Sequence, residues 1–326
     1  MKRLIIIFSI IVLLSGCIQN QNNDNDINQG IDVNIVALNG PTAMGLINFI
    51  DKSNNKEITT NNYKFTIKKS IDEVTTMIAK NQVDIATVPA NLASILYNNT
   101  KENIQVLAIN TLGVLYILEN GNTIKDINDL KGKTIYAAGK GATPEYVLNK
   151  ILDQAGILDS ITIEYKSEQI EVMNALLNKP NAIAMLPQPV ATNAKIKNKD
   201  INIALDLTKI WEQLSIKGSI ITGVTIINKE FAKNNPIVVE DFLTNYQDSV
   251  NLINNDIEQG STLVEKYDII PKPIALQAIP LCNITLIKNK QMYDDLSSYL
   301  KVLYQQNPKS IGGSLPKENF YYNINE

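Results

Sequence analysis

The sequence of 326 residues contains no histidine, and its only arginine is Arg3. Histidine is the commonest general base and a frequent ligand of transition metals, so both chemistries lose their usual side chain. Without an arginine after residue 3, no guanidinium group can bind a carboxylate or sulfonate through two parallel hydrogen bonds. An anion would have to be bound by backbone N–H groups, hydroxyls, amides or lysine.

Positive charge and cysteine are also scarce. Lys and Arg number 30 against 33 Asp and Glu, a net charge of −3, and the two cysteines are Cys17 and Cys282. Nucleic-acid-binding proteins normally carry excess basic residues, so nucleic acid is not an expected partner. A hydrophobic fraction of 44% and a charged fraction of 19% are ordinary for a globular protein. A chain of this length is expected to bury a large core and to form two domains.

The first residues read as a targeting segment. Lys2 and Arg3 precede an apolar run over residues 4–14, which is too short to be a firm prediction of a membrane span. Residues 14–17, Leu-Ser-Gly-Cys, resemble the bacterial lipobox, which implies that residues 1–16 are a lipoprotein signal peptide and that Cys17 is lipidated. An ordinary secretory leader with an incidental cysteine is the alternative, and both place the protein outside the cytoplasm. Residues 17–31 are polar without an apolar period and predict a flexible tether.

A strand–glycine–helix corner occurs twice in the remaining chain. An apolar strand over residues 33–38 runs into Asn39, Gly40, Pro41, Thr42 and Ala43, where glycine permits a tight turn and Pro-Thr suits a helix start. A strand over residues 134–138 is followed by Lys140, Gly141, Ala142 and Thr143 in the same way. Free N–H groups at such helix starts attract negative charge. The repeat predicts two similar lobes that face one ligand.

Around each corner, strands and helices alternate. In the first copy, strands over 63–67 and 83–88 enclose a helix with a Ser70–Glu73 capping box and apolar residues at 71, 74, 77 and 78. In the second, strands over 161–165 and 182–186 enclose a helix capped by Ser167 with an apolar face at 170, 173, 176 and 177. This order predicts parallel sheets with binding loops at the carboxyl ends of the strands. Those ends carry Pro89-Ala90-Asn91 and Pro187-Gln188-Pro189.

Two extended segments are predicted to join the lobes. Residues 104–118 read as consecutive strands that leave lobe one, and residues 219–227 read as the return, with Gly113 and Gly223 as the hinge. The expected domains are residues 32–113 with 224–326 for lobe one, and residues 114–223 for lobe two. Beyond residue 229 the chain reads as mostly helical, with apolar faces at 239–253 and 292–303 that cover the sheet of lobe one.

These features resemble bacterial ABC-transporter substrate-binding proteins, in particular the type II branch for nitrate, sulfonate, taurine and thiamine-precursor uptake. The segments that carry the resemblance are the lipobox at Cys17 and residues 37–42, 84–90, 129–135, 139–146 and 185–189. The resemblance implies a two-lobed α/β periplasmic-binding-protein-like fold (type II), in which each lobe is a mixed sheet flanked by helices and two crossover strands join the lobes. It also implies a lipid-anchored protein on the extracytoplasmic face that closes over a solute and delivers it to a membrane permease. The chain lacks a nucleotide-binding glycine loop, so ATP hydrolysis is expected in a separate subunit.

Four corners are expected to form the solute site. The candidate contacts are Asn39, Gly40, Pro41, Thr42, Ala43, Pro89, Ala90, Asn91, Lys140, Gly141, Ala142, Thr143 and Gln188. Hydroxyls and N–H groups would bind a polar or acidic group that Lys140 could neutralise, although the same residues would also serve as plain helix caps. Tyr116, Tyr136, Tyr146 and Trp211 are either stacking walls or core residues. Cys282 reads as a small buried hydrophobic residue.

The sequence leaves the solute open: a sulfonate, a nitrate-like anion, a pyrimidine precursor or another small heteroaromatic compound. The absence of arginine and histidine argues against an amino acid or a metal ion. We expect a monomer without cofactor, metal or enzymatic activity, because no serine or cysteine lies beside an evident base. The alternatives are an enzyme on the same fold and a surface lipoprotein that docks another macromolecule.

Overall fold

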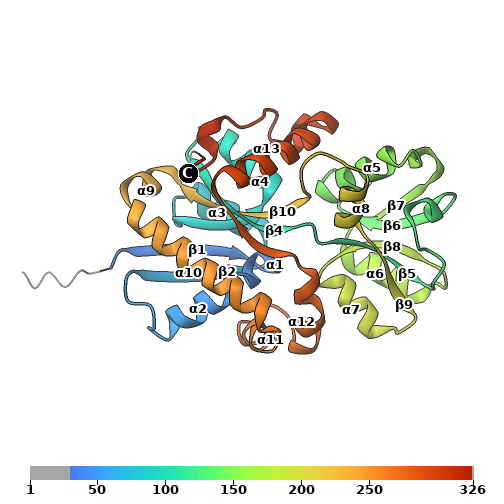
Figure 1. Cartoon of the computed structure of the whole chain (residues 1–326), viewed down its shortest axis with the longest axis horizontal. Helices are drawn as coiled ribbons and strands as arrows, with labels where there is room; N and C mark the ends of the chain where they lie inside the picture. The colour runs from blue at the N-terminus through green and yellow to red at the C-terminus, as the bar shows by residue number, and fades with distance from the viewer. Residues whose placement is uncertain (1–29, 325–326) are drawn as a thin grey trace, which may run out of the picture.

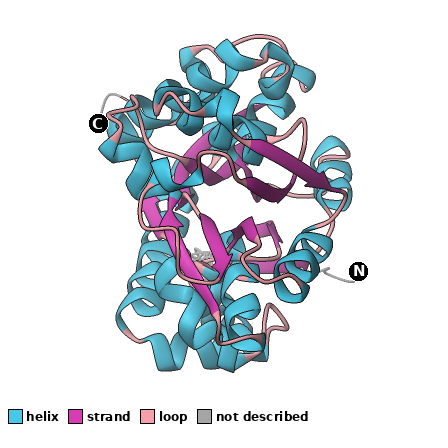
Figure 2. Cartoon of the chain, turned by 90° about the vertical axis from the view of Figure 1, so that its right-hand side faces the viewer, coloured by secondary structure: helices cyan, strands magenta, loops and turns pink. Residues whose placement is uncertain are grey.

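The computed structural model describes residues 30–324, so the leader, Cys17 and the tether up to residue 29 lie outside it. Figure 1 shows two sheets beside each other, with β1 and β2 on the left and β5 to β9 on the right. Figure 2 shows strands through the middle of the molecule and helices on the outside. We call the six-stranded sheet with its helices lobe one, and the five-stranded sheet with its helices lobe two. The predicted α/β fold of two sheets flanked by helices is confirmed.

Most of the strands come where the alternating and apolar runs predict them. The strands are β1 (Asp32–Leu38), β2 (Asn62–Lys68), β3 (Ile85–Pro89), β4 (Ile104–Leu112), β5 (Leu115–Asn120), β6 (Thr134–Ala138), β7 (Thr162–Lys166), β8 (Ile183–Pro187), β9 (Ile201–Asp206), β10 (Ile221–Asn228) and β11 (Ile284–Ile287). The patterns missed β9 and β11, which are edge strands, and edge strands show a weaker apolar signal.

The helices lie between these strands and after them. The α-helices are α1 (Pro41–Met44), α2 (Ile47–Asn54), α3 (Ile71–Ala79), α4 (Ala90–Asn99), α5 (Thr143–Gln154), α6 (Gln169–Asn178), α7 (Val190–Lys197), α8 (Leu207–Gln213), α9 (Lys229–Asn234), α10 (Pro236–Asn255), α11 (Ile257–Lys266), α12 (Lys272–Ala278) and α13 (Asn289–Gln306). Short 3₁₀ turns are η1 (Ile127–Leu130), η2 (Leu158–Ser160), η3 (Ile279–Leu281), η4 (Pro308–Ile311) and η5 (Glu318–Phe320).

The two sheets repeat one topology. In lobe one the order is β11-β4-β10-β3-β1-β2, and in lobe two it is β7-β6-β8-β5-β9. In each, three strands run parallel, and a strand that enters from the other lobe pairs antiparallel with the third of them. The parallel strands therefore end at the same edge of each sheet. Gly223 lies opposite Pro89, and Leu115 lies opposite Pro187, so the entering strands begin at this edge.

Two helix caps differ in detail from their predictions. Ser70 caps α3 by accepting from the N–H of Asp72, but Glu73 binds Lys68 at 3.0 Å and does not complete a capping box. At α6 the N-cap residue is Glu168 and not Ser167. The buried face of α6 consists of Val172, Met173 and Leu176, whereas the side chain of Ile170 is 53% exposed. Both exposed isoleucines at these helix starts, Ile71 and Ile170, lie near the edge where the lobes meet.

The C-terminal helices build the core of lobe one and reach lobe two. The expected apolar faces of α10 and α13 are buried. The ring of Tyr299 on α13 meets Trp211 of lobe two edge-on at 6.4 Å between centroids. At the end of α13, Gln306 donates to the backbone oxygen of Tyr146 at 3.0 Å, and Asn307 donates to the Tyr146 hydroxyl at 2.8 Å. The C-terminal segment thus contacts both lobes.

Candidate functional site

A pocket of about 480 Å³ lies where the two sheets meet. Lobe one contributes the first turns of α3 and α4, and lobe two contributes the first turns of α5 and α6. The residues that line it are Ile71, Pro89, Asn91, Leu92, Ile95, Val114, Leu115, Ala142, Thr143, Pro144, Gln169, Pro187 and Thr222. This volume is typical of a site for a small molecule. Most of the lining side chains are apolar, and the polar ones are neutral.

Four of the predicted contacts line this pocket: Pro89, Asn91, Ala142 and Thr143. The predicted contacts that do not line it are Asn39, Gly40, Pro41, Thr42, Ala43, Ala90, Lys140, Gly141 and Gln188. Sequence reasoning missed most of the apolar lining, although a usable signal existed. Leu92 and Ile95 follow Asn91 at helical spacing on α4, and Ile71 and Gln169 begin the helices that follow the second strand of each repeat.

The first corner is half-buried over Asn39–Pro41 and buried at Thr42 and Ala43. Gly40 has φ of 117°, a conformation that glycine adopts without strain, and it precedes α1. The hydroxyl of Thr42 donates to the carbonyl of Leu38 at 2.7 Å, and Ala43 is fully buried. These side chains are therefore engaged in packing and are not directed at the pocket. The side-chain oxygen of Asn39 is buried without a hydrogen-bond partner among the described residues.

Gly223 explains why the first corner can sit so close to the sheet. A Cβ atom at Gly223 would lie 2.4 Å from the methyl group of Thr42 and 2.5 Å from the side-chain oxygen of Asn110. Asn110 in turn donates to the hydroxyl of Thr225 and accepts from that of Thr111, and all three are buried. The pair Asn110-Thr111, a candidate contact in the crossover, is thus a buried polar cluster within β4.

The second corner lies at the surface of lobe two. The N–H of Gly141 donates to the Glu145 carboxylate at 2.5 Å, so the expectation of a free N–H group does not hold there. The hydroxyl of Tyr146 donates to the carbonyl of Gly141 at 3.1 Å and fixes the turn from the other side. Lys140 is exposed, with its Nζ 5.8 Å from the centroid of the Tyr165 ring. Ala142 and Thr143, the last residues of the corner, are the ones that reach the pocket.

The two candidate amides are already partly bonded. Asn91 donates to the carbonyl of Ser310 at 3.2 Å, which ties the start of α4 to the C-terminal segment. Gln188 is 2% exposed and accepts from the N–H and hydroxyl of Thr192, while its side-chain nitrogen is buried without a partner among the described residues. Gln188 therefore positions α7 next to the pocket edge.

The candidate stacking residues belong to the core. Trp211 is 1% exposed and donates from Nε1 to the carbonyl of Gly218 at 2.8 Å. Tyr116 donates its hydroxyl to the carbonyl of Leu281, and burial raises its pKa above the usual value. Tyr136 and Tyr146 are also buried, and none of the four lines the pocket. Of the two readings that the sequence left open, the structure favours packing.

The proposed hinge glycines have different surroundings. Gly113 lies between β4 and β5, and a Cβ there would lie 2.2 Å from the Thr208 hydroxyl and 3.1 Å from Cβ of Ile220. The outgoing and returning segments thus run side by side at Gly113, which stays a predicted hinge. Gly223 lies inside β10, paired with Thr111 and Pro89, so the crossing lies before it and β10 begins already at Ile221.

Cys282 is the small buried residue that the sequence predicts. It is fully buried, and burial raises its pKa to about 12, so the thiolate that reacts and binds metals is suppressed at neutral pH. No cluster of candidate metal ligands occurs within residues 30–324. Over the same range, no helix has the length and apolar character needed to cross a bilayer.

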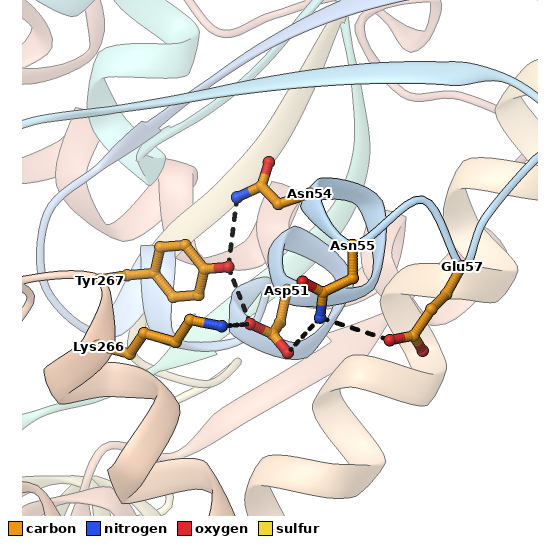
Figure 3. A network of polar contacts seen from close by, with 6 residues as sticks. All are labelled: Asp51, Asn54, Asn55, Glu57, Lys266 and Tyr267. Atoms are coloured by element: carbon orange, nitrogen blue, oxygen red, sulfur yellow. Dashed lines mark hydrogen bonds and ion pairs between the residues drawn. The ribbon is translucent and has the colours of Figure 1, made fainter.

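Other polar clusters serve the scaffold. In Figure 3, Asp51 of α2 accepts from Lys266 at 2.5 Å and from the hydroxyl of Tyr267 at 2.9 Å, beside the C-terminus of α11. Asn54 and Asn55 extend this network along α2. It ties two helices of lobe one together, and none of its members lines the interlobe pocket. A further pocket of about 560 Å³ lies in lobe one, at the edge of its sheet that faces away from the interlobe pocket. It is lined by residues of α3, α4 and the end of β10.

Comparisons with known proteins agree with this fold. The model of the NMT1/THI5-like family matches residues 63–259, more than half of the chain. No curated protein sequence matches this chain. An ABC transporter from Parabacteroides distasonis is similar in structure, with a TM-score of 0.75, 20% identity, and coverage of 89% of this chain and 98% of that one.

Two further structures are similar over most of their length. The periplasmic aliphatic sulphonate binding protein SsuA from Escherichia coli has a TM-score of 0.69 and 15% identity, with 86% of this chain and 90% of that one covered. A Candida albicans protein described as exhibiting the generic periplasmic binding protein fold has a TM-score of 0.53 and 12% identity, with 89% and 92% covered. At such identities the likeness establishes the fold.

Proposed function

The chain belongs to the NMT1/THI5-like family, and we propose that it is the solute-binding component of an ABC importer. The observation that carries the proposal is the interlobe pocket, to which both lobes contribute the first turns of helices. The similarity to an ABC transporter and to a sulphonate binding protein supports the same role. A solute held between two lobes stabilises the closed arrangement over the open one, and a permease can recognise that difference.

The lining indicates what kind of solute would fit. Apolar side chains such as Leu92, Ile95 and Leu115 would cover a sizeable apolar body. Asn91, Thr143 and Gln169 offer neutral donors and acceptors that would orient it. A small heteroaromatic or other partly apolar solute suits this pocket better than a strongly hydrated inorganic anion does, because no cationic side chain lines the pocket in the described chain.

The rest of the proposed role concerns location and partners. We infer from the lipobox that Cys17 carries the lipid anchor and that residues 17–31 hold the folded body above the membrane on its extracytoplasmic face. The expected partners are permease subunits in the membrane with a separate ATPase, and the binding protein is expected to act as a monomer. An enzyme on this fold has less support, because the pocket lining contains no cysteine, lysine or carboxylate for covalent or acid–base catalysis.

The proposal is tested by identifying the solute that the protein carries. The full chain is purified from its native membrane, and the small molecules released by denaturation are identified by mass spectrometry. We expect one compound that, when added back, raises the melting temperature of the protein. Leu92→Asp places an unpaired charge in the pocket and should abolish the shift, whereas Leu315→Asp, at a side chain already 41% exposed on the C-terminal tail, should keep it. A shift that survives Leu92→Asp would contradict the proposed site.

A further inference from the structure

A second chamber adjoins the interlobe pocket within lobe two. It has a volume of about 480 Å³, and it shares Pro144 and Gln169 with the interlobe pocket. Its polar lining comes from the start of α6, with Ser167, Glu168 and Gln169, and from Asn193 of α7. A solute longer than the first pocket could therefore extend into this side chamber past Pro144.

The charge that lines the interlobe pocket and the side chamber, together called the two chambers, is negative. Among the described residues that line them, there is no lysine, and Glu168 is the only charged side chain. The two lysines that adjoin lining residues in the sequence, Lys140 and Lys166, have other contacts. Lys140 lies over the Tyr165 ring, and Lys166 binds the Glu164 carboxylate at 2.5 Å. An anionic group in either chamber would have no cationic side chain in the described lining, and in the side chamber it would face Glu168.

A glutamate lies in the first turn of each lobe-two helix whose start could otherwise bind an anion. The N–H of Gly141, before α5, donates to Glu145. The N–H of Ser167, before α6, donates to Glu171 at 3.0 Å. At both starts, a carboxylate of the helix's own first turn takes the place of an external anion at the positive end of the helix dipole. The two carboxylates therefore disfavour a sulfonate or nitrate at the starts of α5 and α6.

We propose that the solute is an amphiphilic amine, with its apolar body in the interlobe pocket and its ammonium group in the side chamber beside Glu168. The inference rests on the proposed function, since it takes the interlobe pocket to be the solute site. The ammonium group would donate hydrogen bonds to Glu168 and to the amide oxygens of Gln169 and Asn193, and none of the described residues that line the two chambers carries a positive charge.

The test uses three probes that share one apolar body: 2-phenylethylammonium, 2-phenylethanol and 2-phenylethanesulfonate. Their dissociation constants are measured by saturation-transfer NMR titration of the full chain in a mild detergent. We expect the ammonium probe to bind about tenfold more tightly than the sulfonate, with the alcohol between them, as fits one partly screened charge pair. Glu168→Gln should remove the advantage of the ammonium probe, and Glu168→Lys should reverse the order. Asp159→Lys, an equal charge change in the same lobe that lines neither chamber, should leave it unchanged.

The remaining outcomes overturn the inference. A sulfonate that binds as tightly as the ammonium probe, an order that Glu168→Lys does not alter, or no binding by any probe would each contradict it. Leu92→Asp separates this failure from that of the proposed function. If the sulfonate binds best and Leu92→Asp abolishes its binding, the interlobe pocket remains the solute site and only the amine is wrong. If ammonium binding survives Leu92→Trp, which fills the pocket without adding a charge that would attract the probe, both proposals fall.

Discussion

The two strand–glycine–helix corners have the same residue pattern but different surroundings. The first, Asn39–Ala43, is fixed by the sheet of lobe one. Thr42 packs on Gly223 of β10, and the Thr42 hydroxyl donates a hydrogen bond to the carbonyl of Leu38. The second, Lys140–Thr143, is fixed by side chains of its own helix α5. The Glu145 carboxylate accepts from the N–H of Gly141, and the Tyr146 hydroxyl donates to the carbonyl of Gly141. Only the second contributes residues to the interlobe pocket.

The difference follows from what each sheet places behind its corner. In lobe one, the returning strand β10 runs between β3 and β4, and its Gly223 leaves room for Thr42 to approach. A Cβ at either corner glycine, Gly40 or Gly141, would meet no atom within 4 Å, so the difference lies in the contact of Thr42 with β10 and not in the glycines themselves. A repeated motif therefore acts as part of the scaffold in one lobe and as part of the pocket wall in the other.

The largest effect is expected from Gly223→Ala. Its added methyl group would lie 2.4 Å from Thr42 and 2.5 Å from Asn110, so buried backbone must shift. We expect the free energy of unfolding to fall by about 2–3 kcal/mol. Urea unfolding followed by circular dichroism measures it.

Gly141→Ala is the matched control for this change. It meets no atoms, and its cost comes only from the left-handed backbone at φ of 76°, about 1 kcal/mol. Equal losses for the two alanine variants would show that the close approach of Thr42 to Gly223 does not hold the first corner, and the contrast between the corners would disappear.

These contacts mark the limit of what the sequence predicts. The repeat, the alternation of strands and helices and the faces of α10 and α13 follow from local periodicity, so the fold could be predicted. The packing of the first corner against the sheet could not, because the approach of Thr42 to Gly223 joins segments far apart in the chain. The carboxylate of Glu145 on Gly141 is local, and its position in the first turn of α5 offered a signal for an occupied helix start.

Outside its corner, lobe two contains a buried carboxylate that stabilises the sheet. Glu119 of β5 is 1% exposed, and its carboxylate accepts from the N–H and hydroxyl of Thr123 and from the N–H of Ile124. Burial alone would raise the pKa of Glu119, but these hydrogen bonds outweigh it and hold the pKa below its ordinary value of 4.5. The stabilisation is therefore present above that value and is lost as the pH falls through the lower folded-state pKa.

Glu119→Gln should reduce stability near neutral pH by about 2 kcal/mol, because a charged acceptor is replaced by a neutral amide that cannot accept all three bonds. The variant should lose less stability than the wild type when the pH falls below 4.5. Thermal melts from pH 7 to pH 3 measure both effects. Parallel curves for the two proteins would mean that Glu119 does not carry this stabilisation.

A smaller effect separates the two threonines. Thr42→Val removes the hydroxyl that donates to Leu38 and should lower the free energy of unfolding by about 1 kcal/mol, without altering solute affinity beyond that loss. Thr143→Val should leave stability nearly unchanged and weaken solute binding, since Thr143 lines the pocket. Melting curves and titration with the released solute read the two properties separately. A loss of affinity confined to Thr42→Val would place the first corner, and not the second, at the solute.

The smallest expected effect is local to the second corner. Tyr146→Phe removes the hydroxyl that donates to Gly141 and accepts from Asn307, and the phenyl ring keeps the buried packing. Global stability should fall by less than about 1 kcal/mol, but the corner loses one of its two fixed points. Hydrogen exchange followed by mass spectrometry should therefore accelerate in the peptide that covers Gly141–Thr143, while the peptide around Thr42 stays protected, because buried contacts hold the first corner. Equal acceleration in both peptides would mean that Tyr146 supports the molecule as a whole, and that the second corner is no more independent of its lobe than the first.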